Sequence, residues 1–300
     1  MKTRQFTHLW FVLPALLVYG LFVIYPTLSA FLFSFYDWSG FGTQMKFVGM
    51  HNFQEALTSA EVYRAAWHNL IFFVALFMFQ NTVGLFLATQ LDARPRLVEL
   101  YRAVLFLPVI ISLVAVGFIW SLMLSPNIGF LNPLLRDWGL GMIARPWLSD
   151  TTWALPTVIT VQAWQSLGWS IVIYLAGLQN IPQELQEAAV IDGATHWQRF
   201  WRVTFPLLAP AFTSLTVLTF IQIFRTFDVV YVLAGPIGSP AGATDVLGTL
   251  IYRTAFGVTT MTTSSSRFSY AIAISVLLFV VLGIASTILL TQLRRREVQN

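Results

Sequence analysis

The chain has 300 residues, of which 57% are hydrophobic and only 10% are charged. Soluble domains carry about a quarter charged residues, so the composition excludes an ordinary soluble enzyme, a disordered chain and a fibrous chain. The absence of cysteine excludes disulfides, thiolate zinc sites and cysteine nucleophiles. The net charge of +4 is small, and nothing in the sequence indicates nucleic-acid binding. The composition therefore indicates a protein that folds in a lipid bilayer.

Long charge-free runs predict the fold class. A spanning helix needs about 20 mostly apolar residues, and six runs are long enough. They predict an all-α membrane protein with six transmembrane helices, near residues 9–34, 69–91, 103–124, 153–177, 209–232 and 269–292. The loops between them are too short for a second domain of usual size, so residues 1–300 are expected to form a single transmembrane domain.

The lysines and arginines predict the orientation. With the N-terminus inside, the inner segments contain Lys2, Arg4, Arg94, Arg96, Arg102, Arg199, Arg202, Arg294, Arg295 and Arg296. The outer loops then contain the smaller set Lys46, Arg64, Arg136, Arg145, Arg253 and Arg267. Because basic residues gather on the cytoplasmic side, both termini are expected in the cytoplasm.

The segment 179–206, between the fourth and fifth spans, is amphipathic where its neighbours are apolar. Pro182 suits the first turn of a helix that would run to Ile191. Gly193 permits a sharp turn or the close approach of another chain. A second short helix could follow from Thr195 to Val203. The segment therefore predicts a helix–glycine–helix element on the cytoplasmic side.

This element has two interpretations. It could lie among the lipid headgroups, which requires Lys and Arg beside an apolar face. It could also dock a cytoplasmic partner, which the acids Glu184, Glu187 and Asp192 favour over an anionic membrane surface. The small Ala188 and Ala189 leave room for the groove of a partner.

The same residues carry a family resemblance. Glu187-Ala188-Ala189, then Asp192-Gly193-Ala194, and finally Val203-Thr204-Phe205-Pro206 resemble the EAA loop of binding-protein-dependent ABC transporter permeases. The family prefers Ile and Leu where this chain has Val203 and Phe205. Tyr25-Pro26 and Phe227-Asp228 resemble signatures of the carbohydrate-uptake branch, in its six-span glycerol-phosphate and lactose type. Gly235-Pro236 stands where the family often has Gly-Gly-Pro, so the loop geometry there can differ.

The resemblance implies a transport subunit with several partners. A second homologous permease subunit would form the other half of the pathway, and two ATP-binding subunits would dock on residues 179–206. An extracytoplasmic sugar-binding protein would deliver a sugar or related polyol. The ATPase must be separate, because the chain has no phosphate-binding loop of the Gly-x-x-x-x-Gly-Lys-Ser/Thr type. No cofactor and no enzymatic activity are expected, and the location implied is a prokaryotic plasma membrane, crossed several times. The residues implied in ATPase coupling are Glu187, Ala188, Ala189, Asp192, Gly193 and Pro206.

Polar residues within the predicted spans are candidates for the sugar pathway, because such residues are costly in a membrane. Gln162, Gln165 and Trp169 share one helical face, with Ser166 close by. Amides suit sugar hydroxyls, and an indole ring can stack on a pyranose. The alternative is that these side chains only form hydrogen bonds between helices.

A second set of polar residues lies in the fifth span. Gln222, Arg225 and Asp228 recur at a spacing of three, and the last two could form an internal ion pair. The pair could be structural, or it could serve a self-contained secondary transporter, although that class is expected to show inverted repeats. The four histidines, His8, His51, His68 and His196, have no metal-ligand spacing, and no catalytic motif supports a membrane enzyme.

Overall fold

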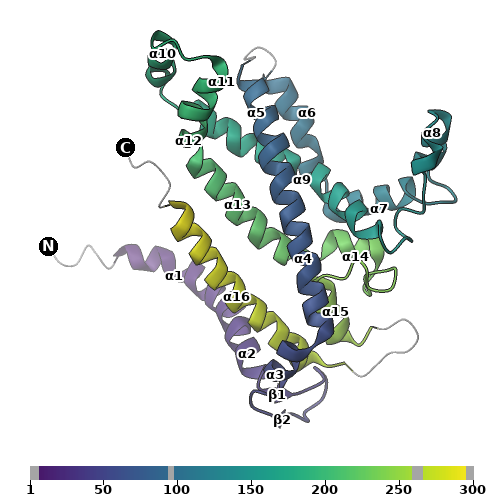
Figure 1. The fold of residues 1–300 in the computed structure, drawn as a ribbon. Coiled ribbons are helices and arrows are strands. Elements are labelled where there is room, and N and C mark those ends of the chain that lie inside the picture. The colour runs from purple at the N-terminus through teal and green to yellow at the C-terminus, as the bar shows by residue number, and fades with distance from the viewer. Residues whose placement is uncertain (1–6, 94–97, 259–265, 295–300) are drawn as a thin grey trace. The chain divides into compact units, whose positions relative to one another are not determined.

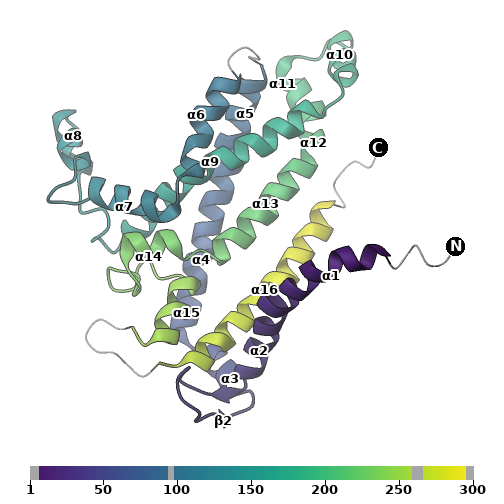
Figure 2. The same ribbon diagram turned by 180° about the vertical axis from the view of Figure 1, so that it is seen from behind.

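The computed structural model describes residues 7–93, 98–258 and 266–294, which are mostly helical (Figures 1 and 2). The chain divides into two compact units. Unit 1 comprises residues 1–62 and 251–280, and unit 2 comprises residues 63–250 and 281–300. Several basic residues used for the predicted orientation lie outside the described residues, namely Lys2, Arg4, Arg94, Arg96, Arg295 and Arg296.

Unit 1 combines helices with a short hairpin. Its elements are α1 (Thr7–Tyr19), a π-helical turn (Gly20–Ile24), α2 (Tyr25–Phe33), β1 (Tyr36–Asp37), β2 (Lys46–Phe47), α3 (His51–Thr58), the end of α15 (Leu247–Phe256) and the first half of α16 (Phe268–Arg294). The strands are antiparallel, with Tyr36 opposite Phe47, so the chain is not wholly helical as predicted. Asn52 donates to the carbonyl oxygens of Ser34 (2.9 Å) and Tyr36 (2.8 Å), which ties α3 to the hairpin.

Unit 2 contains most of the helices. In chain order they are α4 (Ala60–Phe79), a π-helical turn (Gln80–Gly84), α5 (Leu85–Asp92), α6 (Val98–Ile110), α7 (Leu113–Met123), α8 (Leu131–Asp137), a 3₁₀ turn (Gly141–Ile143), α9 (Ala154–Gln179), α10 (Gln183–Ile191), α11 (His196–Arg199), a π-helical turn (Phe200–Thr204), α12 (Phe205–Leu207), α13 (Ala209–Phe224) and α14 (Asp228–Ala234). The first residues of α4 belong to unit 1, and α15 begins in unit 2.

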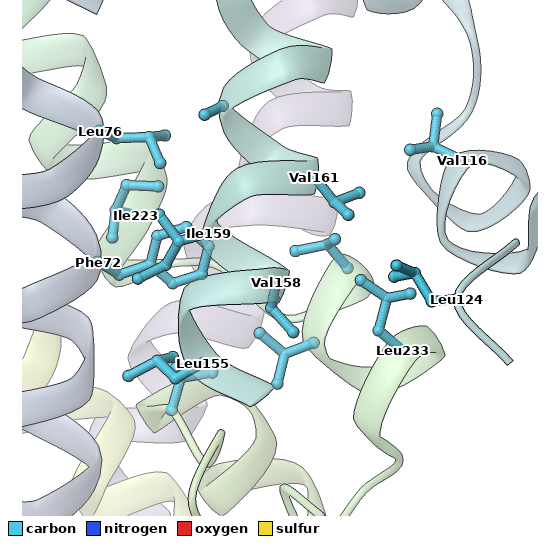
Figure 3. Close-up of a cluster of buried hydrophobic side chains, with 14 residues drawn as sticks. Phe72, Leu76, Val116, Leu124, Leu155, Val158, Ile159, Val161, Ile223 and Leu233 are labelled. Carbon is cyan, nitrogen blue, oxygen red and sulfur yellow. The ribbon is translucent and has the colours of Figure 1, made fainter. Parts of the chain in front are cut away.

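Helix α9 is the centre of unit 2. It packs against α5, α6, α13 and α14, and 67% of its most apolar window is buried. Figure 3 shows its side chains Val158 and Ile159 among Phe72 of α4, Ile223 of α13 and other buried aliphatic side chains. Gly168 lets α6 approach, because a β-carbon there would lie only 2.8 Å from the Leu105 carbonyl oxygen. Small residues at helix contacts are typical of membrane bundles.

All six predicted spans coincide with apolar helical segments. Within the described residues, four helices are long and apolar enough to cross a membrane: Val12–Phe33, Ala60–Asp92, Ala154–Gln179 and Phe268–Leu293. Two bent pairs also qualify when each pair is taken together: Glu99–Ile110 with Leu113–Met123, bent by 89°, and His196–Leu207 with Ala209–Phe224, bent by 61°. The described residues therefore contain up to six candidate spans, if each bent pair counts as one.

Two predicted spans are not the single helices expected. Residues 103–124 are broken between α6 and α7, where Ser112 has an extended backbone (ψ 135°). Residues 209–232 are broken after α13, since Phe227 leaves the helical region (φ −140°) before α14 begins.

A tertiary hydrogen bond explains the second break. In an unbroken helix the Ile223 carbonyl would accept from the amide of residue 227. Here the side-chain amide of Asn69, on α4, donates to that carbonyl oxygen at 2.7 Å. The Asn69 oxygen in turn accepts from the Leu247 amide at 2.9 Å, and Asn69 is fully buried. The Ile223 carbonyl thus accepts from the Thr226 amide (3.1 Å) in the last turn and from a distant residue, whose contribution hydropathy alone cannot reveal.

Candidate functional site

Residues 183–205, which we call the coupling element, form the predicted helix–glycine–helix. It lies at the end of unit 2 where α9 ends and α13 begins (Figures 1 and 2). Gly193 has φ +77°, a conformation that other residues adopt at a cost. The Gly193 amide donates to the Val190 carbonyl and the Ala194 amide donates to the Ala189 carbonyl, both at 3.0 Å. This pair of bonds is the Schellman motif, which ends α10 sharply.

Glycine is needed at position 193 for its backbone conformation, and not because a larger side chain would lack space. A β-carbon at this position would meet no atom within 4 Å. After the turn, α11 begins with a capping box: the Gln198 amide donates to the Thr195 hydroxyl (3.3 Å), and the Thr195 amide donates to the Gln198 side-chain oxygen (2.9 Å). The Gln186 amide donates to the Thr204 hydroxyl at 3.2 Å and links α10 to the π-helical turn. The two helices are therefore held to each other by the turn and by this bond.

The predicted coupling residues lie on different sides of the element. Ala189 is buried and faces inward, whereas Glu187, Ala188 and Asp192 are exposed. The Glu187 carboxylate accepts a 2.7 Å hydrogen bond from Gln183 within α10. Pro206 is partly buried in α12. The outer surface of α10 also exposes Ile191, at 85% of its full accessibility. Apolar and small side chains beside carboxylates make this surface suitable for a partner protein.

A cavity of about 470 Å³ lies within unit 2 and is lined by residues of α9, of α13 and of the break after α13. Four of the six predicted pathway residues line it: Gln162, Trp169, Gln222 and Arg225. Trp169 is 52% exposed, and the edge-to-face contact of its ring with Phe106 (5.6 Å between centroids) holds the indole in place. The other two predicted residues, Gln165 and Ser166, are buried and do not line the cavity.

Buried polar side chains meet next to the cavity, and we call Gln80, Gln162, Ser166 and Thr219 the polar cluster. Gln80, in the π-helical turn after α4, donates to the Ser166 hydroxyl at 3.0 Å and accepts from the Thr219 hydroxyl at 2.6 Å. Ser166 also donates to the Gln162 carbonyl oxygen at 2.7 Å. Gln80 thereby joins helices α9 and α13, and all four residues are at most 2% exposed.

Gln162 has unused hydrogen-bonding capacity at the cavity. Its amide nitrogen donates to the Gln165 side-chain oxygen at 3.3 Å, but its own side-chain oxygen is buried without a partner. A buried acceptor without a donor costs about 1–3 kcal/mol. A hydroxyl-bearing molecule in the cavity is one source of the missing donor.

The predicted ion pair between Arg225 and Asp228 is not formed. Arg225 ends α13 and Asp228 begins α14, so the break separates them, and none of the ion pairs among described residues joins the two. Both side chains are exposed and line the cavity. The regular spacing of three presumed a continuous helix, which the structure lacks here.

Gln80 and Thr219 were missed from the sequence. Gln80 lies in the charge-free second span and could have been found by the same argument that singled out Gln162. Thr219 gave no signal, because threonine readily satisfies itself within a helix. Among the described residues, no group of three or more His, Asp and Glu side chains could hold a metal ion.

Comparison with known proteins identifies a protein family whose model matches this chain. Residues 80–299 match the family model described as "Binding-protein-dependent transport system inner membrane component". The probable ABC transporter permease protein YurN of Bacillus subtilis is 33% identical over 90% of each chain. The lactose transport system permease protein LacF of Rhizobium radiobacter is 32% identical over 96% of this chain and 94% of its own. The sn-glycerol-3-phosphate transport system permease protein UgpA of Agrobacterium fabrum is 33% identical over 82% of each.

A solved structure has the same fold. The chain is similar to one in the crystal structure of a bacterial ABC transporter involved in the import of the acidic polysaccharide alginate, with a TM-score of 0.82. The match covers 97% of this chain and 96% of the other at 24% identity. At this identity the likeness concerns the fold.

Proposed function

From the premise that this chain belongs to the family of inner-membrane components of binding-protein-dependent transport systems, we propose that it is the permease subunit of an ATP-driven importer of a sugar or related polyol. Relatives named for the transport of lactose and of sn-glycerol-3-phosphate support this class of substrate. The chain is a membrane protein of the inner membrane and a transport subunit.

The structure and exposed surface of the coupling element are the main support for this proposal. A separate ATP-binding subunit receives the exposed surface of α10, with Ala188 and Ile191 in its groove and Glu187 and Asp192 at the rim. Small and apolar side chains allow close packing in a groove, and the carboxylates select a basic partner surface. The chain itself has no phosphate-binding loop, so the energy must come from this contact.

The element acts as a rigid lever. The turn at Gly193 fixes the angle between α10 and α11, and the bond from Gln186 to Thr204 holds α10 against the turn that leads into α13. When the two ATPase subunits close, displacement of α10 is passed to α13 with little loss in the connecting loop. Pro206 and the residues around it form the entry to that helix.

The cavity is the proposed sugar pathway within this subunit. Gln162 and Gln222 present amides to sugar hydroxyls, and Trp169 offers an aromatic ring for stacking. Arg225 can donate to hydroxyl or anionic groups of the substrate. Gln165 and Ser166 support this wall from behind, since they are buried and do not line the cavity.

The remaining partners follow from the family. We expect a second homologous permease subunit to complete the pathway and an extracytoplasmic sugar-binding protein to load it. With six crossings both termini lie in the cytoplasm, on the same side as the coupling element. Alternating exposure of the cavity to the two sides then moves the sugar inward.

Pull-down and uptake together test this function. Purified with its ATP-binding subunit, the unchanged transporter and the Ala188→Ser variant should retain the ATPase and should drive ATP-dependent sugar uptake into vesicles. Ala188→Trp should insert normally and lose both, because the exposed alanine becomes too large for a groove. Normal uptake and ATPase binding by Ala188→Trp would overturn the docking surface. Uptake by the chain alone without ATP would overturn the importer.

A further inference from the structure

The second half of the coupling element has a surface that ATPase docking by α10 does not use. We call residues 196–205 the aromatic–basic segment. Trp197 and Trp201 are 71% and 46% exposed, and their rings meet edge to face at 5.5 Å. Trp201 also contacts Phe205 at 5.0 Å. These three rings follow one another at a spacing of four residues, so they form one continuous aromatic face.

The charge of this segment is opposite to that of α10. Arg202 is exposed and Arg199 is partly exposed, and residues 194–207 contain no Asp or Glu. Arg199 lies 3.0 Å from the His196 ring nitrogen, but neither arginine forms an ion pair with a carboxylate in the described part of the chain. By contrast α10 and its C-cap carry Glu184, Glu187 and Asp192. The acidic and basic halves of the element are therefore suited to different partners.

The geometry brings the aromatic–basic segment to a membrane surface. The helical run His196–Leu207 is bent by 61° from α13, the candidate spanning helix that follows it directly. Spanning helices tilt by about 20° on average from the bilayer normal. If α13 lies near the normal, the run before it is inclined by about 30° from the membrane plane. It then lies at the interface, where Trp rings are enriched.

We propose that the aromatic–basic segment is a lipid-binding anchor for anionic phospholipid headgroups. Trp197, Trp201 and Phe205 enter the headgroup region, and the guanidinium groups of Arg199 and Arg202 bind lipid phosphates. A helix that lies among lipid headgroups requires basic residues beside an apolar face, and only this half of the coupling element has them. The anchor keeps this segment at the membrane surface, along which it moves together with α10 when the ATPase closes. This inference depends on the crossing of the membrane by α13 and not on the identity of the substrate.

Spin labels at single cysteines test the depth of the segment, and the chain has no native cysteine to remove. The full transporter with Trp197→Cys or Trp201→Cys is labelled and placed in vesicles of equal parts phosphatidylcholine and phosphatidylglycerol. Glu184→Cys, exposed on α10, is the matched control. Labels at 197 and 201 should be relaxed more by oxygen, which enters lipid, than by a water-soluble nickel chelate, and the label at 184 should show the reverse.

The arginines are tested in the same assay. With Arg199→Gln and Arg202→Gln together, the label at 197 should move toward water in vesicles that contain phosphatidylglycerol. The partition should change by about fivefold for each arginine. Vesicles of phosphatidylcholine alone should show no such change, and Lys46→Gln, an exposed basic residue in unit 1, should have no effect in either. The proposal is overturned if the labels at 197 and 201 are as water-accessible as the label at 184. It is also overturned if they are protected only when the ATPase is bound, since the surface then belongs to a protein.

Discussion

The coupling element and the polar cluster both rely on glutamine, but the glutamine of the first is exposed at the surface and that of the second is buried at the cavity wall. Gln183 is exposed and bonds to Glu187 one turn away on the same helix. Gln80 is 2% exposed, and its bonds reach residues 86 and 139 positions further along the chain. A lost bond is replaced by water in the first case and leaves an orphan group in the second. Substitutions in the element should therefore change transport, and loss of Gln80 from the cluster should lower stability.

The turn at Gly193 should give the largest effect of all. Gly193→Val forces a β-branched residue to φ +77°, which costs at least about 1–2 kcal/mol and favours another helix angle. ATP-dependent uptake should fall by at least about tenfold, because the lever no longer has its geometry. The amount of inserted transporter and its unfolding midpoint should stay near normal.

Gly193→Asn is the matched control for this turn. Asparagine tolerates the left-handed conformation, and its β-carbon has open space at this position. We expect most of the uptake to be kept. If Asn inactivates as strongly as Val, then a partner packs against the glycine and the turn angle is not the reason for its presence.

The cluster should show the opposite pattern. Gln80→Leu removes the acceptor of Thr219 and the donor to Ser166 between buried helix faces. The free energy of unfolding in detergent should fall by about 1–3 kcal/mol. Gln183→Leu on the exposed surface of α10 should change it by less than about 0.5 kcal/mol. Equal losses for the two variants would remove the contrast between the regions.

Two glutamines of the helix bundle differ in whether they line the cavity, and they extend the comparison. Gln222 is exposed and lines the cavity, so Gln222→Ala should raise the KM for sugar uptake by up to about tenfold with normal assembly. Gln165 is 6% exposed and lies outside the lining, so Gln165→Ala should lower stability more than it changes the KM. Sugar dependence of uptake and thermal unfolding separate the two variants. A KM effect at Gln165 equal to that at Gln222 would place both residues on the pathway.

Much of the fold could be predicted because apolar runs and glycine turns are local signals. The helix that ends at Ile191 and the left-handed turn at Gly193 needed only the adjacent sequence. The break after Phe224 could not be predicted, since it depends on Asn69 from a helix about 150 residues away in the chain. For the same reason Gln165 and Gln162 looked alike on their helical face, although only Gln162 lines the cavity.

The smallest expected effect on stability comes from an ion pair in unit 1. The same pair tests whether the stability differences described above depend on charge. Arg267 donates to both carboxylate oxygens of Glu55, at 2.7 and 2.5 Å. The hydrogen bonds from Arg267 hold the pKa of Glu55 below its ordinary value, against the opposing effect of partial burial. A depressed carboxyl pKa contributes stability above the ordinary pKa, and that stability is lost as the pH falls through the lowered value.

The pH dependence of unfolding separates this pair from the polar cluster. Both partners are about a third or more exposed, so Glu55→Gln should cost less than about 1 kcal/mol at neutral pH. The difference from the unchanged protein should shrink in acid, as Glu55 itself becomes protonated. The loss caused by Gln80→Leu should stay constant over the same range, because amides and hydroxyls do not titrate there. If the loss from Gln80→Leu also shrank in acid, the cluster would have to be coupled to an ionised group, and its stability would not rest on neutral hydrogen bonds alone.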